Sequence, residues 1–276
     1  MIELPETHVL ADQINTSLVG KKIIGVVANS TPHSFAWFNI DPAEYNKKLR
    51  GKEIISAKAS IGRSCGSSVE IVCEDTILCL STPIKYHGFG DKLPKKHQLL
   101  VEFADSTHIS CTVQMWGSLF CYDFNRDELP EKPNHISPFT EDFNKSYFEN
   151  LINSTPAKYS AKAFLATEQR IPGLGNGVLQ DILFNSKTHP KTRLETLSDE
   201  DFDNMYNALK ITLRDMYERG GRDTEKDLFS CNGGYKTILS KKTINAPCPM
   251  CEGELIREAY LGGNIYFCPT CQPLKK

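Results

Sequence analysis

Two Cys-x-x-Cys pairs near the C-terminus constrain this 276-residue chain more than any other feature. Cys248 and Cys251 form the first pair, and Cys268 and Cys271 form the second after sixteen intervening residues. Two residues between cysteines let both sulfurs turn inward, and two such knuckles complete a tetrahedral shell. The spacing therefore predicts one structural Zn²⁺ ion, because four sulfur ligands leave no open position for a substrate.

The residues between the two pairs are typical of a β-hairpin. Glu254–Ala259 and Ile265–Phe267 flank the turn-forming sequence Leu261-Gly262-Gly263-Asn264. The other six of the ten cysteines lie in apolar runs or in loops, which favours free thiols in a reducing compartment over a disulfide framework. Zinc ribbons bind DNA, RNA or protein in different proteins, so the hairpin alone does not define a function.

Upstream of the hairpin, the chain divides into a strand-rich part and a helical part. A short helix is predicted between Pro5 and Gly20, because apolar residues recur there at helical spacing. Close turns then separate six strand-like runs, as in an antiparallel sandwich or barrel: Ile23–Val27, Val69–Cys73, Thr76–Leu80, Leu99–Phe103, His108–Val113 and Ser118–Tyr122. The segment Asp123–Phe139 is predicted to be a linker.

Four helices are predicted after this linker. Two cover about Asp142–Asn153 and Ala157–Thr167, and a third begins near Asn176. The fourth has the clearest signals, since Ser198 is an N-cap, Asp201 stands at the capping-box position, and two glycines follow the last apolar residue. The sequence thus predicts an α+β protein with domains at 1–125, 140–232 and 233–276.

The bulk composition indicates an ordinary globular protein. Hydrophobic residues make up 40% and charged residues 24%, and no apolar run is long enough to span a membrane. The N-terminus lacks the basic start and apolar stretch of a signal peptide, so we expect a soluble cytoplasmic protein. The net charge of −2 argues mildly against nucleic acid, but Lys236, Lys241 and Lys242 lie in an acid-free stretch. That stretch is either a local basic face or a solvated loop.

The segment Arg170-Ile-Pro-Gly-Leu-Gly175-Asn176 separates two predicted helices. Asn176 is placed to cap the following helix, and exposed amides at a helix N-terminus suit a phosphate. The alternative is an ordinary capped turn without a ligand. The residues themselves leave both interpretations open.

Three separated features occur in order along the chain: the start Met-Ile-Glu-Leu-Pro-Glu, the turn Gly-Leu-Gly-Asn with the later His189-Pro190, and the four-cysteine hairpin. In this order they resemble the formamidopyrimidine-DNA glycosylase and endonuclease VIII family. The resemblance spans the chain and implies an N-terminal β-sandwich catalytic domain, a helix–two-turn–helix domain and a C-terminal four-cysteine zinc hairpin that reaches DNA. It also implies that a damaged base is flipped out of double-stranded DNA into a pocket between the two domains.

The resemblance assigns expected roles to individual residues. Glu3 falls on the catalytic glutamate of the family, and Glu6 falls on a second acidic position of the same helix. Asn176, after Gly175, falls on the asparagine that holds a DNA phosphate, and Lys162 falls on a lysine of the preceding helix. Without the motif, Glu3 would be interpreted as a solvated terminal residue.

The N-terminus departs from the family pattern. Family enzymes expose an N-terminal proline whose secondary amine attacks the sugar C1′ to form a Schiff base. Here position 2 is Ile, and a bulky residue there is expected to block removal of Met1. The primary amine of Met1 is then the candidate nucleophile, displaced by one residue.

Other parts of the family pattern are also altered. The loop Ser60–Ser68 offers only Arg63 where the family has a lysine that assists strand cleavage. The arginine-rich wedge loop corresponds to Val113–Gly117, where Met115 and Trp116 are either an apolar wedge at an unstacked base step or the end of a core strand. Near the hairpin tip, Gly263 or Asn264 replaces an arginine.

Three functions are compatible with these features. The first is a DNA glycosylase of base-excision repair with weakened or absent AP-lyase activity, in which Glu3 activates water or protonates the leaving base or sugar. The second is a non-catalytic protein that binds damaged or branched DNA on the same scaffold. The third is a zinc-ribbon protein that acts on RNA or protein. For the first two, the expected partner is duplex DNA with a damaged base or abasic site. We expect a monomer that joins the nucleoid when bound to DNA.

Overall fold

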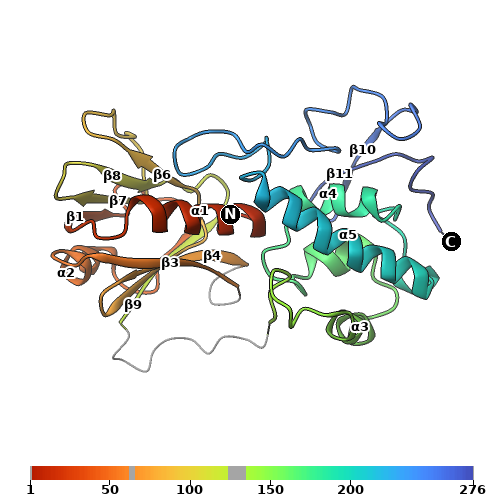
Figure 1. Ribbon diagram of the computed structural model, residues 1–276, viewed down its shortest axis with the longest axis horizontal. Helices are drawn as coiled ribbons and strands as arrows, with labels where there is room; N and C mark the ends of the chain where they lie inside the picture. The colour runs from red at the N-terminus through yellow and green to blue at the C-terminus, as the bar shows by residue number, and fades with distance from the viewer. Residues whose placement is uncertain (1, 62–65, 124–134, 276) are drawn as a thin grey trace. The chain divides into compact units, whose positions relative to one another are not determined.

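The computed structural model describes residues 2–61, 66–123 and 135–275, and it divides into two compact units. The first unit contains Met1–Asn134 and Gly220–Gly234, and the second contains His135–Arg219 and Tyr235–Lys276. Residues 220–232, which the expected boundaries assigned to the helical domain, and residues 233–234, which they assigned to the hairpin, therefore belong to the strand-rich unit. The four-cysteine hairpin belongs to the same unit as the helices (Figure 1).

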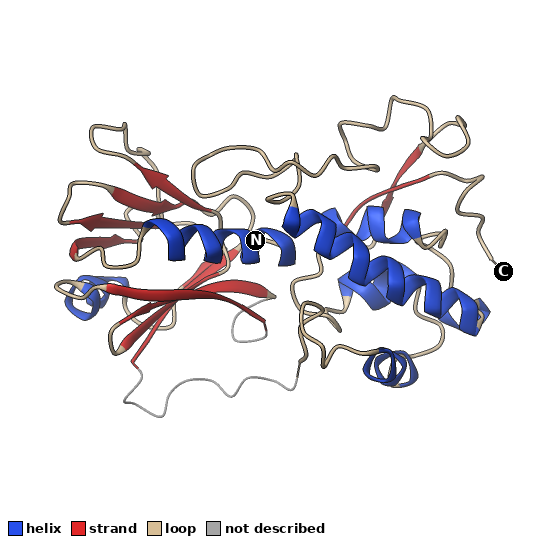
Figure 2. Cartoon of the chain, viewed as in Figure 1, coloured by secondary structure: helices blue, strands red, loops and turns tan. Residues whose placement is uncertain are grey.

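Two β-sheets form the body of the first unit (Figure 2). One sheet has the order β1-β7-β8-β6, from strands β1 (Ile23–Ala28), β7 (Leu99–Phe103), β8 (His108–Cys111) and β6 (Ile84–His87). The other has the order β2-β9-β5-β4-β3, from strands β2 (Ala36–Trp37), β9 (Gly117–Asp123), β5 (Thr76–Leu80), β4 (Ser67–Cys73) and β3 (Ile54–Ile61). All pairings are antiparallel except that of β2 with β9, which is parallel.

Apolar side chains from both sheets and from α1 (Leu4–Ser17) make one buried core. The α1 helix packs against β3 and β4, and the short α2 (Tyr45–Leu49), which follows the 3₁₀ turn Pro42–Glu44, packs against β1. Burying this surface is the main stabilising contribution, at roughly 25 cal/mol for each Å² of apolar area removed from water. The core holds the start of α1 in place, and Glu3 and Glu6 lie at this end of the helix.

Helices dominate the second unit. They are α3 (Lys145–Asn153), the π-helical segment Ala163–Thr167, α4 (Asn176–Asn185), the 3₁₀ turn Leu194–Thr196 and α5 (Asp199–Glu218). The α4 helix packs against α5, against the π-helical segment and against the second hairpin strand. Two turns join the π-helical segment to α4, with positive φ at Gln169 (49°) and at Gly173 (82°). The helix–two-turn–helix arrangement expected from the resemblance is therefore present.

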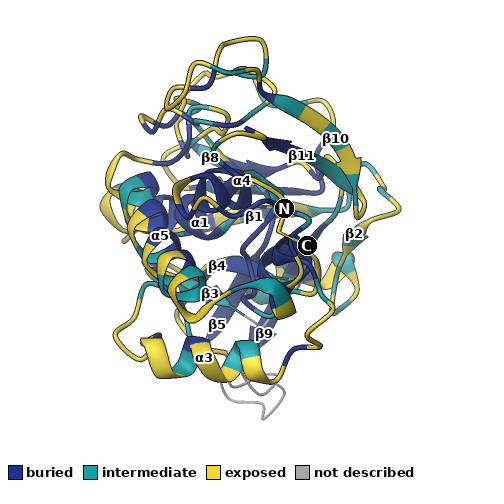
Figure 3. Cartoon of the chain, turned by 90° about the vertical axis from the view of Figure 1, so that its right-hand side faces the viewer, coloured by how far each residue is buried: buried dark blue, intermediate teal, exposed yellow. Residues whose placement is uncertain are grey.

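The hairpin consists of β10 (Ile256–Tyr260) and β11 (Gly263–Phe267), paired in antiparallel register around Leu261-Gly262. Figure 3 shows α4 largely buried, whereas β10 is only partly covered. The buried amide of Gln180 joins α4 to β11, because its Oε1 accepts from the Tyr266 N–H at 3.0 Å and its Nε2 donates to the Asn264 carbonyl at 3.2 Å. This amide fixes the hairpin against α4.

Several predicted elements are confirmed, and others need correction. The α5 capping box is present, because Ser198 and Asp201 bond each other's backbone. All six predicted strand-like runs form strands. The elements β2, β3, β6 and α2 were not predicted from the sequence. The prediction that Asn176 caps α4 is wrong, since Gly175 is the N-cap and the Asn176 side chain bonds the hairpin instead. Asn176 is instead the first residue of α4, and its Nδ2 donates to the Asn264 carbonyl of the hairpin.

Candidate functional site

The carboxylates of Glu3 and Glu6 lie at the start of α1 in the first unit. Glu3 is the N-cap residue, with extended backbone and no side-chain capping bond, and Glu6 is in the first helical turn. Glu6 is only 5% exposed, which is costly for a charged group without a partner. A cation must therefore lie close by.

That cation is Arg222, which is 3% exposed. Its Nε and Nη2 atoms donate to the two oxygens of Glu6, each at 2.9 Å, and its backbone N–H donates to the Glu6 Oε1 at 3.1 Å. Its Nη1 atom lies 3.3 Å from Glu3 Oε2. Burial alone would lower the pKa of Arg222, but the charges of Glu3 and Glu6 outweigh burial and raise it. Arg222 is thus a permanent cation between two carboxylates.

The loop that carries Arg222 is ordered by its own contacts within the first unit. Asp227 accepts from the Gln13 side chain of α1 at 2.9 Å, and the Leu228 carbonyl accepts from the Tyr86 N–H of β6 at 2.8 Å. The mixed charge of this stretch is typical of a solvated loop. Its docking on α1 and β6 instead fixes the guanidinium beside the acidic residues.

Arg222 was not among the site residues predicted from the sequence. Its neighbours Asp223, Glu225 and Lys226 suggest an exposed loop. One signal was available, because Glu6 lies in an apolar helical turn and a buried acid needs a cation. Nothing in the sequence indicates which arginine supplies it.

The candidate nucleophile Met1 lies outside the described residues, as does Arg63 of the 62–65 segment. The nitrogen that follows Met1 is described. The Ile2 N–H donates to the Ser81 carbonyl at 3.0 Å, the Ile2 carbonyl accepts from Ser67 Oγ at 3.0 Å, and the Ile2 side chain is 7% exposed. The backbone at position 2 is therefore an internal amide held in the core.

Met115 and Trp116 lie in the segment that connects β8 to β9. The Met115 side chain is 72% exposed, which excludes a core position, and Trp116 is partly buried. The rings of Trp116 and Trp37 lie 5.8 Å apart at an interplanar angle of 50°. Phe35 is exposed in the same part of the chain, and its carbonyl accepts from the Gly117 N–H at 2.9 Å. The exposed side chain of Met115 is therefore adjacent in sequence to Trp116, whose ring lies against that of Trp37.

In the second unit, Lys162 and Asn176 meet at the tip of the four-cysteine hairpin. The Asn176 Nδ2 donates to the Asn264 carbonyl at 2.8 Å, and the Lys162 ammonium donates to the Tyr260 carbonyl. Lys162 is only 2% exposed, and burial lowers its pKa. Within the described part of the chain, Lys162 has no acidic partner. A buried cation without an acid attracts an anion such as a phosphate.

Gly263 occupies the position closest to both side chains. A Cβ atom at Gly263 would lie 3.5 Å from the Lys162 Nζ and 3.5 Å from the Asn176 Nδ2, which is ordinary contact distance. Either Gly263 or Asn264 was expected to replace the hairpin arginine of the family. The geometry selects Gly263 as the position whose side chain would point at this pair.

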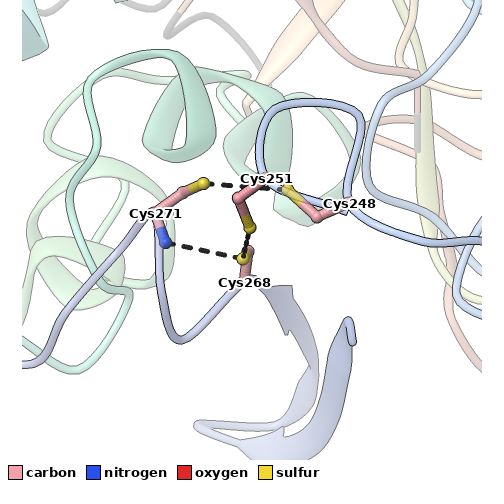
Figure 4. Close-up of side chains that lie close together, drawn as sticks. All are labelled: Cys248, Cys251, Cys268 and Cys271. Carbon is pink, nitrogen blue, oxygen red and sulfur yellow. Dashed lines mark hydrogen bonds between the residues drawn. The ribbon is translucent and has the colours of Figure 1, made fainter. Parts of the chain in front are cut away.

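The four cysteines form one cluster in the second unit (Figure 4). Their sulfurs all lie within 4.8 Å of one another, with Cys248 and Cys271 at 3.7 Å and Cys251 and Cys268 at 3.4 Å. A tetrahedral shell with metal–sulfur bonds of ~2.3 Å places its sulfurs about 3.8 Å apart. The cluster therefore fits a metal ion, and it is far too open for disulfide bonds.

Known proteins give the same classification as the geometry. No family model matches the chain. The formamidopyrimidine-DNA glycosylase of Cytobacillus firmus is 24% identical over 288 residues, covering 99% of this chain and all of that protein. The Bacillus subtilis protein of the same name is 26% identical over 292 residues and covers both chains fully. The crystal structure of Lactococcus lactis Fpg with abasic-site DNA has a TM-score of 0.81 at 23% identity and covers 98% of this chain and 99% of that chain.

The fold and the cysteine cluster define an α+β protein with a β-sandwich unit and a helical unit that carries a four-cysteine hairpin. This is the fold of the solved Fpg structures. The amino-acid sequence is also similar, over the whole chain, to proteins named formamidopyrimidine-DNA glycosylase, and the resemblance inferred from its motifs is confirmed.

Proposed function

We propose that this protein is a DNA glycosylase that removes damaged bases from double-stranded DNA in base-excision repair. The observation that carries the proposal is the Glu3 carboxylate at the start of α1, 3.3 Å from the buried cation Arg222. Whole-chain similarity to proteins named formamidopyrimidine-DNA glycosylase supports it. A base inside a duplex is out of reach of a carboxylate, so the damaged base leaves the stack before reaction.

The reaction is hydrolysis of the bond between the base and C1′ of the sugar. Glu3, as a carboxylate, takes a proton from water while the water oxygen bonds to C1′. The bond between C1′ and the base nitrogen breaks, and its electron pair leaves with the base. The proton then passes from Glu3 to the base. The products are the free base and an abasic site in an intact strand.

Direct measurement of base release tests this function. Duplexes that each carry one lesion, including formamidopyrimidine, oxidised and alkylated bases, are incubated with the protein, and free base is measured by mass spectrometry. We expect release from at least one lesion, and loss of that release in Glu3→Gln. If no lesion loses its base but damaged DNA still binds, the chain is a non-catalytic binding protein.

Strand cleavage through a Schiff base is weak or absent in this proposal. An amide nitrogen has no available lone pair, so the Ile2 nitrogen, which donates to Ser81, is not a nucleophile. Only the amine of Met1 could attack. Borohydride added to the protein with abasic-site DNA is expected to trap little adduct, while intact mass shows whether Met1 is retained. Efficient trapping that disappears when the N-terminus is acetylated would instead assign the lyase step to that amine.

Lys162, Gly175 and Asn176 form the proposed phosphate contact in the second unit. We expect Asn176→Ala to weaken duplex binding equally for all sequences, because a phosphate contact carries no base information. Asn207→Ala, at an exposed asparagine of α5, is the matched control. Equal affinities of the two variants at matched salt would remove this assignment.

The remaining assignments complete the proposal. The cysteine cluster holds one structural Zn²⁺, and Met115 with Trp116 enters the base step left unstacked by the flipped nucleotide. The protein acts as a monomer on genomic DNA, which in a bacterium lies in the cytoplasm. No helix in the described part of the chain is both long and apolar enough to cross a membrane.

A further inference from the structure

Arg222 is bound to Glu6 and Glu3 in two different ways. Glu6 receives the bidentate fork of the guanidinium, from Nε and Nη2, and it also receives the Arg222 backbone N–H. The Nη1 atom of Arg222 lies 3.3 Å from Glu3 Oε2, and the Glu3 side chain is more exposed, at 14% against 6% for Glu6. Three bonds fix Glu6 to the loop, and Nη1 of the same guanidinium lies next to Glu3. Glu6 therefore holds the guanidinium in place, and the remaining nitrogen, Nη1, interacts with Glu3.

The loop backbone leaves Arg222 little freedom. The Gly233 N–H donates to the Arg222 carbonyl at 3.2 Å, and a Cβ atom at Gly233 would lie 2.1 Å from the carbonyl carbon of Gly221. Gly221 has a φ of +94° and lies against the Glu6 carboxylate. The guanidinium is thus held from both ends, by its own loop and by Glu6. A group placed in this way can set the position of a neighbour.

We propose that Arg222 is the positioning residue of the catalytic centre, which holds Glu3 in place as a carboxylate while Glu6 anchors the guanidinium. The inference rests on the proposed function, in which Glu3 takes the proton of the attacking water. A carboxylate that is bonded to a fixed guanidinium keeps one orientation, so Glu3 is held in the position from which it can act as a base. The planar fork gives this ion pair a direction that a lysine ammonium lacks.

Other charged groups also face Arg222. Glu225 lies 4.0 Å from it, and burial raises the pKa of Glu225 despite the opposing effect of Arg222. Lys226 and Asp227 line the same small cavity as Glu6 and Arg222. The Asp227 carboxylate accepts from the side chain of Gln13 and from the N–H of Cys231. Arg222 itself contacts the carboxylates of Glu3, the N-cap residue of α1, and of Glu6 in its first turn.

The test measures the mobility of the Glu3 side chain directly. Side-chain order parameters of ¹³C-labelled glutamates are measured by NMR relaxation, and Glu3→Gln identifies the Glu3 signal. Removal of Arg222 alone leaves Glu6 charged and buried without a partner, which could unfold the protein. The main variant is therefore Glu6→Gln/Arg222→Gln, compared with Glu6→Gln, which keeps the arginine beside Glu3. Arg222→Lys retains the charge without the fork, and Arg219→Gln removes an exposed arginine of α5 as the matched control.

In Glu6→Gln/Arg222→Gln we expect the order parameter of the Glu3 side chain to fall clearly below its value in Glu6→Gln, because the guanidinium no longer holds the carboxylate. We expect Arg219→Gln to match the wild type and Arg222→Lys to lie between the wild type and the double variant. The single-turnover rate of base release should fall about tenfold or more from Glu6→Gln to the double variant, with little change in duplex affinity. Identical Glu3 order parameters with and without the arginine would overturn the proposal.

The proposal and the function on which it rests fail in different ways. A wild-type protein that releases no base from any lesion contradicts the glycosylase function, and the NMR order parameters still decide whether Arg222 positions Glu3. Base release that is lost in Glu3→Gln but has the same rate in Glu6→Gln and in the double variant supports the function. That result contradicts a positioning role of Arg222.

Discussion

At the scale of single residues, the site in the first unit depends on contacts between positions far apart in the sequence. Glu6 and Arg222 are separated by 216 residues, and together they bury a carboxylate and a guanidinium. Breaking such a pair by removing one partner typically costs 3–5 kcal/mol, on the order of a third of a domain's stability. The pair therefore constrains the fold as well as the chemistry.

Gly233 gives a residue-scale prediction about this pair. A methyl group at Gly233 would lie 2.1 Å from backbone atoms of Gly221, so the loop carrying Arg222 must move. We expect Gly233→Ala to lower the free energy of unfolding by about 1–3 kcal/mol. Gly88→Ala is the control, because its methyl group would meet only the end of the Asp91 side chain, at 3.4 Å. Denaturant unfolding at pH 7 measures both variants, and equal midpoints would contradict the close approach described here.

Gly263 gives a second prediction at this scale. An arginine at Gly263 adds a guanidinium next to Lys162 and Asn176, where a Cβ atom fits at 3.5 Å from each. We expect Gly263→Arg to bind duplex DNA more tightly at low salt and to steepen the slope of log K against log salt by about one. Gly263→Gln has similar length without charge and is the control. If both variants show the wild-type slope in fluorescence anisotropy, the hairpin tip does not face a phosphate.

At the scale of elements, the parts that depend on local signals were predictable. The knuckle spacing located the hairpin, and Ser198 with Asp201 located the start of α5. The missed β6 has four residues, and its pairing with β8 and its bond to Leu228 arise only in the folded chain. The placement of the Asn176 side chain was missed for a similar reason. Its bond to Asn264 crosses 88 residues, whereas a capping rule considers only neighbours.

The hairpin provides an element-scale prediction about metal. Cys248 and Cys268 belong to a small apolar cluster with Phe184 of α4, so loss of the ion should loosen the contact with α4. We expect one Zn²⁺ per chain by mass spectrometry, and faster hydrogen exchange in β10 and β11 after chelation or in Cys268→Ser. Cys231→Ser changes an exposed cysteine outside the cluster and is expected to retain the metal. Unchanged exchange in both strands would contradict a structural role.

At the scale of the whole molecule, each compact unit contains one candidate site. The first holds Glu3, Glu6 and Arg222, and the second holds Lys162 and Asn176 beside the hairpin tip. The resemblance selected the acidic residues and the proposed phosphate-binding residues, because their motifs are short and local. Arg222 was found only in the folded chain, since the mixed charge around it is typical of an exposed loop. The proposed activity combines chemistry in one unit with DNA contacts in the other.

The central claim is that Glu3 supports hydrolytic base removal without strand cleavage. An end-labelled duplex with one susceptible lesion is incubated with the protein, and half of each sample is heated in alkali before gel electrophoresis. We expect the wild-type reaction to leave the strand intact without alkali and to yield a cleaved strand after alkali, and we expect Glu3→Gln to yield neither. A strand cut without alkali, or alkali-labile sites formed equally by Glu3→Gln, would contradict the account.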